Sequence, residues 1–398
     1  MKKGWQTKRL GDIADVSAGN SAPQDDFLFK DGTYPFFRTS DAGRVRFGEI
    51  HESADYLNDE GIKGLRRFPK GTILFPKSGA STFLNHRVML GVEGCVSSHL
   101  ATIVADATKI EPRFLLFFLS TIATQDLIQD HSYPSLNLPV ISSIGIHVPP
   151  IPEQQRIVGI LDKAFDAIAA AKANVEKNLQ NAHDLFESKL QSIFSQRGAD
   201  WADTKLGEVC VFVRGPFGGS LKKSIFVPVG YAVYEQQHAI YNQFDDIRYF
   251  VSETKFEEMK RFELLPNDLI MSCSGTMGRV AVVPKDIKRG IINQALLKLT
   301  PSAKISNAFL KFWMESEAFQ AALKEYSGGA AIQNVASVKI LKEIRVPLPK
   351  IQEQERIVEK LDSLRKETQR LESLYHRKLD VLGAFKKSLL HEAFAGEL

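Results

Sequence analysis

The stretch Glu153–Asp162, EQQRIVGILD, occurs a second time as EQERIVEKLD at Glu353–Asp362. Seven of the ten positions are identical, and the two copies are offset by 200 residues in a chain of 398. A proline-rich segment precedes each copy, VPPIP at Val148–Pro152 and VPLPK at Val346–Lys350. A repeat in fixed register across half the chain indicates a duplicated structural unit.

Shorter matches extend the duplication over a whole unit. GTILFPKSG at Gly71–Gly79 matches NDLIMSCSG at Asn267–Gly275 with an offset of 196. IEPRFLLFFL at Ile110–Leu119 matches ISNAFLKFWM at Ile305–Met314 with an offset of 195. Order and spacing are therefore kept over about 195 residues, and chance similarity does not hold register for this long.

The first part of each unit reads as a compact globule of the α+β (mixed α/β) class. Glycine and proline separate short apolar runs typical of strands, and longer apolar stretches follow with helical spacing. The predicted strands are Ile73–Phe75, Ala101–Val104, Leu269–Met271 and Val280–Val283, and the predicted helices are Phe114–Leu127 and Ala308–Lys324. The sequence thus predicts globules at 1–150 and 200–347, each followed by a helical segment, at 151–199 and 348–398.

The second part of each unit predicts one long helix. Glu153–Gln196 contains no proline and a single glycine. A helix of about 45 residues is roughly 65 Å long. Apolar or small residues recur in steps of three and four, the pattern of an a/d seam. The seam positions are Ile157, Leu161, Ala164, Ile168, Ala171, Val175, Leu179 and Ala182, and, 200 residues later, Ile357, Leu361, Leu364, Thr368, Leu371, Tyr375, Leu379 and Leu382.

Two arrangements of these helices fit the pattern. In one, each helix packs only on its own globule. In the other, the two helices pack on each other as an antiparallel coiled coil. The equal lengths and matching seams favour the second arrangement.

Composition is that of an ordinary globular protein, with 44% hydrophobic and 25% charged residues and a net charge of +4. Apolar runs fall short of the roughly 18 residues that a membrane span requires, and the N-terminus lacks a signal-peptide core. The three cysteines are widely spaced and never form CxxC, which predicts reduced thiols and a cytoplasmic protein. The modest basic excess permits nucleic-acid binding.

Motifs for catalysis are missing from the sequence. The dipeptide Gly-Lys does not occur, so a P-loop is excluded, and the histidines are not at metal-ligand spacing. The single Pro-Pro pair, at Pro149, has apolar neighbours and reads as a linker rather than as an adenine-methyltransferase tetrapeptide. Asp268, Asp286 and Lys288 loosely resemble a metal-dependent nuclease core, but Thr72 replaces Asp268 in the first unit. The sequence therefore predicts a chain that is not itself an enzyme and binds no cofactor or metal.

Polar loop residues at matched positions of the two globules are of the types that contact phosphates and base edges. They follow the predicted strands, which repeat, while the loop side chains differ between the copies. The candidates for DNA contact are Arg38, Thr39, Ser40, Lys77, Ser78, Tyr133 and Asn137 in the first globule, and Gln236, Gln237, Ser274, Thr276, Arg279, Gln333 and Asn334 in the second.

The tandem order of variable globule and EQxRIVxxLD helix, with the lead-ins VPPIPEQQRIV and VPLPKIQEQERIV, resembles the DNA-specificity subunit (HsdS) of type I restriction–modification systems over nearly all of the chain. The resemblance implies two target-recognition domains, each recognising one half of a split, asymmetric sequence in double-stranded DNA. It also implies that the helices form the spacer and the docking surface for two methyltransferase (HsdM) subunits. Residues at the helix starts would serve these roles: Glu153, Gln154, Arg156, Ile157, Leu161, Glu353, Gln354, Arg356, Ile357 and Leu361.

The same resemblance assigns the chemistry to partner subunits. S-adenosylmethionine is used for adenine methylation, and two further restriction (HsdR) subunits, where present, use ATP with Mg. Two other readings stay open on the residues alone: a coiled-coil scaffold without DNA contact, and a self-sufficient DNA methyltransferase or nuclease. Salt-sensitive DNA binding separates a DNA reader from the scaffold, and S-adenosylmethionine binding by the chain alone identifies the enzyme.

Overall fold

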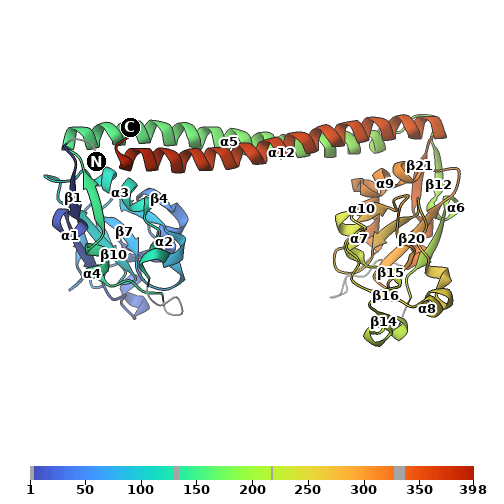
Figure 1. Cartoon of the computed structure of the whole chain (residues 1–398), viewed down its shortest axis with the longest axis horizontal. Coiled ribbons are helices and arrows are strands. Elements are labelled where there is room, and N and C mark those ends of the chain that lie inside the picture. Colours follow the sequence, from blue (N-terminus) through green and yellow to red (C-terminus); the bar gives the residue numbers. More distant parts are fainter. Residues whose placement is uncertain (1–3, 129–133, 217, 327–336) are drawn as a thin grey trace. The chain divides into compact units, whose positions relative to one another are not determined.

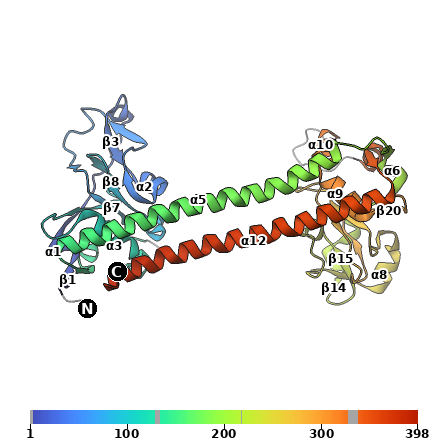
Figure 2. The same cartoon turned by 90° about the horizontal axis from the view of Figure 1, so that it is seen from above.

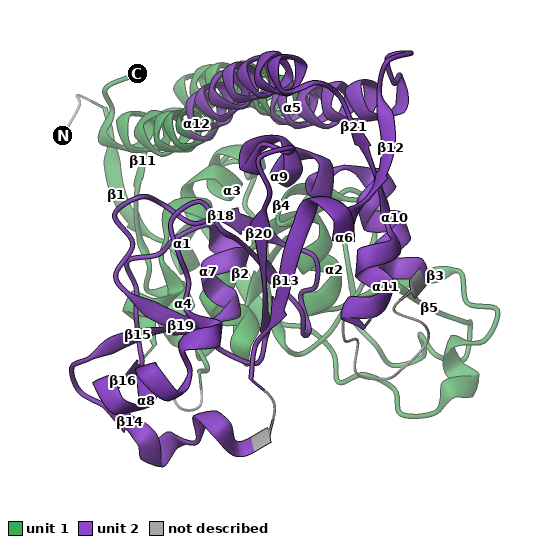
Figure 3. Ribbon diagram, turned by 90° about the vertical axis from the view of Figure 1, so that its right-hand side faces the viewer, with its two compact units in different colours: residues 1–175, 377–398 green, residues 176–376 purple. Residues whose placement is uncertain are grey.

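The computed structural model describes residues 4–128, 134–216, 218–326 and 337–398. The chain forms two compact units, unit 1 comprising Met1–Val175 with Arg377–Leu398, and unit 2 comprising Glu176–His376. Each unit thus contains one globule and a part of each long helix, as the two colours of Figure 3 show.

Unit 1 consists of short strands and helices followed by the start of a long helix. Among its described residues the elements are β1 (Gln6–Arg9), α1 (Leu10–Ile13), β2 (Ala14–Ala18), η1 (Asp26–Phe29), β3 (Tyr34–Phe37), α2 (Thr39–Val45), β4 (Phe47–Ile50), β5 (Asp55–Leu57), β6 (Arg67–Phe68), β7 (Ile73–Pro76), η2 (Ala80–Leu84), β8 (Arg87–Leu90), β9 (Gly94–Val96), β10 (Leu100–Ala105), α3 (Pro112–Thr121), η3 (Thr124–Leu127), α4 (Leu138–Ser142), β11 (Gly145–Val148) and α5 (Ile151–Ser195).

Two sheets form the body of unit 1, in the orders β2-β10-β7-β8-β4 and β5-β3-β9-β6. β1 pairs with β11, which leads directly into α5. Helix α3 lies between the first sheet and the long helices (Figure 1), and its phenylalanines belong to one core with residues of the sheet and of both long helices. Glu111 begins α3 by accepting a hydrogen bond from the Phe114 N–H (2.6 Å), with Pro112 in the first turn.

Unit 2 repeats this plan. Its described elements are β12 (Ala202–Lys205), α6 (Leu206–Val209), β13 (Cys210–Arg214), η4 (Gly218–Leu221), η5 (Lys223–Ile225), β14 (Phe226–Val227), β15 (Tyr231–Tyr234), α7 (Gln236–Tyr241), β16 (Phe250–Val251), α8 (Glu253–Glu258), η6 (Lys260–Phe262), β17 (Leu269–Ser272), β18 (Val280–Val282), β19 (Gly290–Ile292), β20 (Leu296–Pro301), α9 (Asn307–Glu315), α10 (Glu317–Tyr326), α11 (Val338–Glu343), β21 (Arg345–Leu348) and α12 (Ile351–Ala395). The sheets have the orders β13-β20-β17-β18 and β14-β16-β15-β19, and β12 pairs with β21.

The predicted mixed α and β fold and its duplication are confirmed, whereas two predicted helices differ in extent. The helix predicted over Phe114–Leu127 ends at Thr121, and a 3-10 turn follows. The helix predicted over Ala308–Lys324 is two helices that meet at Ser316, which is fully buried and donates its hydroxyl proton to the Trp313 carbonyl (2.6 Å). A serine bonded to its own backbone in this way competes with the helical ladder and favours a break.

The predicted long helices are present as α5 and α12, each 45 residues and uninterrupted (Figure 2). In unit 1 the start of α5 packs with the end of α12, since the Lys386 Nζ lies 4.2 Å from the centre of the Phe165 ring. In unit 2 the end of α5 packs with the start of α12, since the guanidinium of Arg365 lies 4.6 Å from the Phe186 ring. The helices therefore pair antiparallel.

Candidate nucleic-acid interface

In unit 1, three loops meet at one end of the globule. β3 and β9 run parallel, and beyond them the Ser97 N–H donates to the Phe37 carbonyl (2.9 Å). The Lys77 N–H donates in turn to the His99 carbonyl (3.0 Å). Ser97–His99 therefore lies between the loop after β3 and the loop after β7. We call this group, Arg38–Ser40, Lys77–Ser78 and Ser97–His99, the loop end of unit 1.

Unit 2 has the same main-chain arrangement. The Asn293 N–H donates to the Tyr234 carbonyl (2.9 Å), and the Cys273 N–H donates to the Ala295 carbonyl (2.9 Å). The loop end of unit 2 is accordingly Glu235–Gln237, Cys273–Ser274 and Asn293–Ala295. The middle segments, Ser97–His99 and Asn293–Ala295, were not among the residues predicted from the sequence. Their position depends on the parallel pairing of strands about 60 residues apart, which leaves no local sequence pattern.

A glycine closes each loop end at an equivalent place. A Cβ on Gly19 would lie 2.3 Å from the Ser97 oxygen, and a Cβ on Gly215 would lie 1.8 Å from the Asn293 oxygen. Both distances are too short for a side chain, so the two positions require glycine. The main-chain framework of the two loop ends is therefore the same, and their side chains differ.

Several predicted residues of unit 1 are placed at the loop end. Thr39 and Ser40 form the first turn of α2, and Arg38 pairs with Asp55. The hydroxyl of Ser78 hydrogen-bonds the His99 Nδ1 (2.8 Å), and Lys77 is half-buried beside it.

Asn137 has a structural role that the sequence did not predict. Its side-chain oxygen accepts a hydrogen bond from the Val140 N–H (2.9 Å) and caps α4. Its neighbour Leu136 donates its N–H to the Lys77 carbonyl (2.7 Å), which brings the segment beside the loop end. Tyr133, also predicted to contact DNA, lies outside the described residues.

The predicted residues of unit 2 are partly occupied by contacts within the unit. The Gln237 amide donates to the Asp246 carbonyl (3.2 Å), and the Gln236 side-chain oxygen is enclosed. Ser274, Thr276 and Arg279 belong to the loop after β17, where Thr276 and Arg279 are exposed. Ser272 shapes that loop, since its hydroxyl donates to the Thr276 carbonyl (2.6 Å) and accepts from the Arg279 N–H (3.0 Å). Gln333 and Asn334 lie outside the described residues.

The side chains that cap α2 and α7 beside the two loop ends differ in kind. In unit 1 the buried carboxylate of Asp41 accepts from the Arg38 N–H (2.7 Å) and the Ala54 N–H (2.9 Å) and pairs with Arg44. In unit 2 the buried imidazole of His238 accepts from the Glu235 N–H (2.9 Å). The cap therefore combines a base with an acid in one unit and an acid with a histidine in the other.

The opposite end of each globule is fixed to its long helix by a glutamine. Gln154 is fully buried; its oxygen accepts from the Glu111 N–H (2.7 Å) and its amide donates to the carbonyls of Lys109 (3.2 Å) and Pro149 (2.8 Å). Gln354 makes the same three bonds, to the Ser306 N–H (2.8 Å) and to the carbonyls of Lys304 (3.0 Å) and Pro349 (2.9 Å). This contact explains why the repeated motif contains a glutamine.

The helix-start residues predicted as spacer and docking surface divide into two sets. One set is buried against the globule of its own unit and fixes the helix to it: Gln154, Ile157, Leu161, Gln354, Ile357 and Leu361. The other set is half-buried or exposed. In it, Glu153 forms an ion pair with Arg156 one turn later, and Glu353 forms one with Arg356. Arg156 also donates to the Leu398 carbonyl (2.7 Å).

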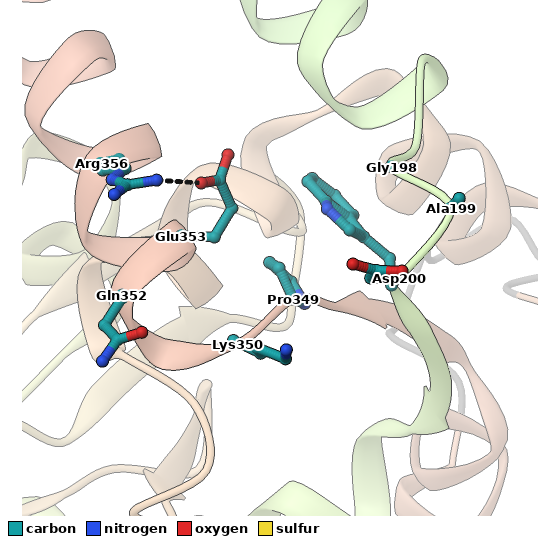
Figure 4. Close-up of a pocket in the computed structure, with 9 residues that line it drawn as sticks. Gly198, Ala199, Asp200, Pro349, Lys350, Gln352, Glu353 and Arg356 are labelled. Atoms are coloured by element: carbon teal, nitrogen blue, oxygen red, sulfur yellow. Dashed lines mark hydrogen bonds and ion pairs between the residues drawn. The ribbon is translucent and has the colours of Figure 1, made fainter.

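A cavity of about 400 Å³ lies beside the start of α12 in unit 2, lined by Gly198, Ala199, Asp200, Trp201, Pro349, Lys350, Gln352, Glu353 and Arg356 (Figure 4). Acids and bases face it together, and Glu353 and Arg356 pair with each other. Because β20 runs from the loop end toward the Gln354 contact, this cavity and the loop end lie at opposite ends of the globule.

Asp268 and the three cysteines are paired or buried. Asp268, part of the nuclease-like pattern, accepts from the Leu265 N–H (2.9 Å) and the Thr300 hydroxyl (2.5 Å) and lies 3.8 Å from Lys298. Cys95, Cys210 and Cys273 are free and buried, and burial raises the pKa of Cys210 and Cys273 to about 12. Within the described residues, no group of three or more His, Cys, Asp or Glu side chains is placed to hold a metal ion. No helix there has the length and apolar character of a membrane span.

Known proteins share both the sequence pattern and this fold. Residues 2–180 and 198–376 match the type I restriction modification DNA specificity domain. The MjaVIII type I restriction enzyme specificity subunit of Methanocaldococcus jannaschii is 23% identical over 95% of this chain and 92% of its own length. The MjaIX specificity subunit of the same organism is 27% identical over 42% of this chain, a match that spans 39% of the relative's length.

A solved structure of a type I R-M system, concerned with complex assembly and conformational transition, contains a chain that superposes with a TM-score of 0.81. The sequence identity is 19%, and the match covers 100% of this chain and 99% of the other. The likeness in structure supports the fold, and the two sequence matches together span most of the chain. The chain therefore belongs to the type I restriction modification DNA specificity family, with one copy of the domain in each half.

Proposed function

We propose that this chain is the DNA-specificity subunit of a type I restriction–modification complex, and that the globules 1–150 and 200–347 each recognise one half of a split, asymmetric target in double-stranded DNA. One observation supports this above all: the two loop ends share a main-chain framework and differ in their side chains. Equal frameworks with unlike polar side chains suit two surfaces that bind the same polymer at different sequences.

The long helices provide the docking surface for partner subunits in this proposal. Leu185 on α5 in unit 2 and Phe385 on α12 in unit 1 are 200 residues apart in the repeat and are 53% and 50% exposed. Val381, one turn before Phe385, is 65% exposed. Neighbouring exposed apolar side chains such as Val381 and Phe385 mark a surface for protein contact, and Leu185 holds the equivalent position in unit 2. An apolar position repeated in both units suits two copies of one methyltransferase subunit.

The catalytic steps belong to those partners. The methyltransferase subunits use S-adenosylmethionine, and restriction subunits, if present, use ATP with Mg, whereas this chain binds neither. The proposal places the chain in the cytoplasm.

The helices also set the gap between the two half-sites. Adding one heptad to both α5 and α12 lengthens each helix by about 10 Å, or about three base pairs of DNA. We expect the recognised gap to grow by that amount while both half-sites stay the same. An unchanged gap in the lengthened variant contradicts this role of the helices.

The function is tested by mapping N6-methyladenine at base resolution in a methylation-free host that expresses this chain with its methyltransferase subunit. We expect a split motif with two unlike halves that disappears when this chain is omitted. Exchange of residues 201–347 for those of another family member should change one half only. An undivided motif, or a soluble complex whose DNA binding does not weaken with salt, contradicts the proposal.

A further inference from the structure

The middle segment of each loop end is a tight turn. The Leu100 N–H donates to the Ser97 carbonyl (3.0 Å), and the Leu296 N–H donates to the Asn293 carbonyl (3.2 Å). These are the i to i+3 bonds of a β-turn. The first side chain of each turn also accepts the N–H two residues later: Asn293 Oδ1 from Ala295 (3.0 Å) and Ser97 Oγ from His99 (3.4 Å). The turn is therefore specified by its first residue.

Neighbouring segments hold this turn on both sides. The first residue of the turn donates its N–H to the last residue of β3 or β15. The third residue of the turn accepts an N–H from the loop after β7 or β17. Gly19 and Gly215 approach the first residue of the turn at distances that exclude a side chain. A backbone held in this way loses little conformational entropy when its side chains bind a ligand.

The two turns present different side chains on this fixed backbone. Unit 1 presents Ser98 and His99, and because the His99 Nδ1 is bonded to Ser78, its Nε2 is the ring nitrogen without a partner among the described residues. Unit 2 presents Gln294 and Ala295 at the same two positions. Gln294 is exposed, and its amide makes no hydrogen bond within the part of the chain that the structure describes. The Gln237 amide already donates to the Asp246 carbonyl, and the Gln236 side-chain oxygen is buried without a hydrogen-bond partner in the described parts of the chain.

We propose that Gln294 is a specificity-determining residue that recognises an adenine in the half-site bound by unit 2. A glutamine amide matches adenine in the major groove, since it donates to N7 and accepts from the N6 amino group. Ser98 is too short to form this pair from the equivalent position, so the half-site of unit 1 differs there. This inference rests on the proposed function and assigns one residue within it.

The test compares Gln294→Ala and Gln294→Glu with the matched control Gln196→Ala. Gln196 is an exposed glutamine of the same unit that follows α5, at the helix end of the globule. Each variant is expressed with the methyltransferase subunit, methylation is mapped, and binding of the purified complex is measured on duplexes with each base at each target position. The exchange of residues 201–347 identifies the half-site of unit 2.

We expect Gln294→Ala to lower the preference for adenine at one position of that half-site by roughly tenfold or more, and to leave the other half-site unchanged. Gln294→Glu should shift the preference at the same position toward cytosine, because a carboxylate accepts a hydrogen bond from the cytosine amino group. The control should keep the wild-type motif. Equal base preference of wild type and both Gln294 variants at every position overturns the inference. An undivided wild-type motif overturns the proposed function instead.

Discussion

Each unit has a loop end and, at the opposite side of the globule, a helix end where Gln154 or Gln354 joins the globule to its long helix. The two ends differ in whether their side-chain contacts are the same in both units. At the helix end, Gln154 and Gln354 make the same three hydrogen bonds in both units. At the loop end, the main-chain bonds are the same but the side chains are not, as Ser98 opposite Gln294 illustrates. Backbone bonds and close glycines thus specify the loop framework, which leaves the exposed side chains free to differ.

The largest effect is expected from Gln154→Glu at the helix end. The change removes both amide donors from the Lys109 and Pro149 carbonyls and buries a carboxylate beside them. An unpaired charge in a buried site costs about 3–5 kcal/mol. We expect the free energy of unfolding of unit 1 to fall by about that amount, measured by hydrogen exchange at residues 109–111 and by thermal unfolding.

The neighbouring Gln155→Glu is the matched control, because Gln155 is exposed on the same turn of α5. It should change the stability of unit 1 by less than about 0.5 kcal/mol. The defect of Gln154→Glu should shrink as the pH falls from 8 to 5, since burial favours the protonated carboxyl and a protonated carboxyl donates to one of the carbonyls. Equal stability of the two variants at pH 8 contradicts the assigned role of the Gln154 contact.

A smaller effect is expected from Asp41→Asn at the loop end of unit 1. The substitution keeps the shape but leaves one neutral acceptor oxygen. The Arg38 and Ala54 N–H groups donate to different carboxylate oxygens, so one of them faces an amide NH2 in the variant. Hydrogen bonds to charged groups stabilise by about 1.5–3 kcal/mol, against about 1 for neutral ones. We expect a loss of about 2 kcal/mol, measured by chemical denaturation, and faster exchange of the Ala54 amide.

Asp12→Asn provides the comparison for this prediction. Asp12 accepts from the Arg9 N–H (3.1 Å) in the same type of cap, but it is exposed. Its replacement should cost well under 1 kcal/mol, because water already satisfies much of the carboxylate. If both variants lose the same stability, burial of Asp41 does not determine its contribution.

The duplication and the long helices were predictable because their signals are local and periodic. The seven identities at one offset, and the apolar residues in steps of three and four, can be read from the sequence without knowing how the globules fold. The middle turn of each loop end was missed because the parallel pairing of β3 with β9 places it, and a single sequence does not show such a pairing. The cap formed by Asn137 was not predicted, because an asparagine before a proline-containing helix also suits base recognition, and its contact with DNA stays a prediction.

The helix seam was predicted in its spacing but not in its partners. The first seam residues, Ile157 and Leu161, pack in the core with α3 of their own globule, and so do Ile357 and Leu361 with α9. The helices therefore pack on each other, as the second arrangement predicts, and the globule of each unit also covers the helix starts. Periodicity identifies which face is buried, and the covering element comes from the fold.

The smallest effect is expected for the cation–ring contacts between α5 and α12, which differ between the two units. In each, α5 supplies a phenylalanine and α12 a cation: Phe165 with Lys386 in unit 1, and Phe186 with Arg365 in unit 2. Double-mutant cycles with Leu for phenylalanine and Met for the cation should give coupling energies of about 0.5–1 kcal/mol at pH 7.

Burial, and secondarily the charge of Lys172, lowers the pKa of Lys386, so its proton is bound more weakly in the folded state than in the unfolded one. Between these two pKa values a rise in pH therefore favours folding, while the neutral amine no longer attracts the ring. We expect the Phe165 coupling to decrease from pH 7 to pH 10 and the Phe186 coupling to persist, because arginine stays charged. Couplings that stay unchanged from pH 7 to pH 10 in both units would show that they reflect apolar packing and not the charges.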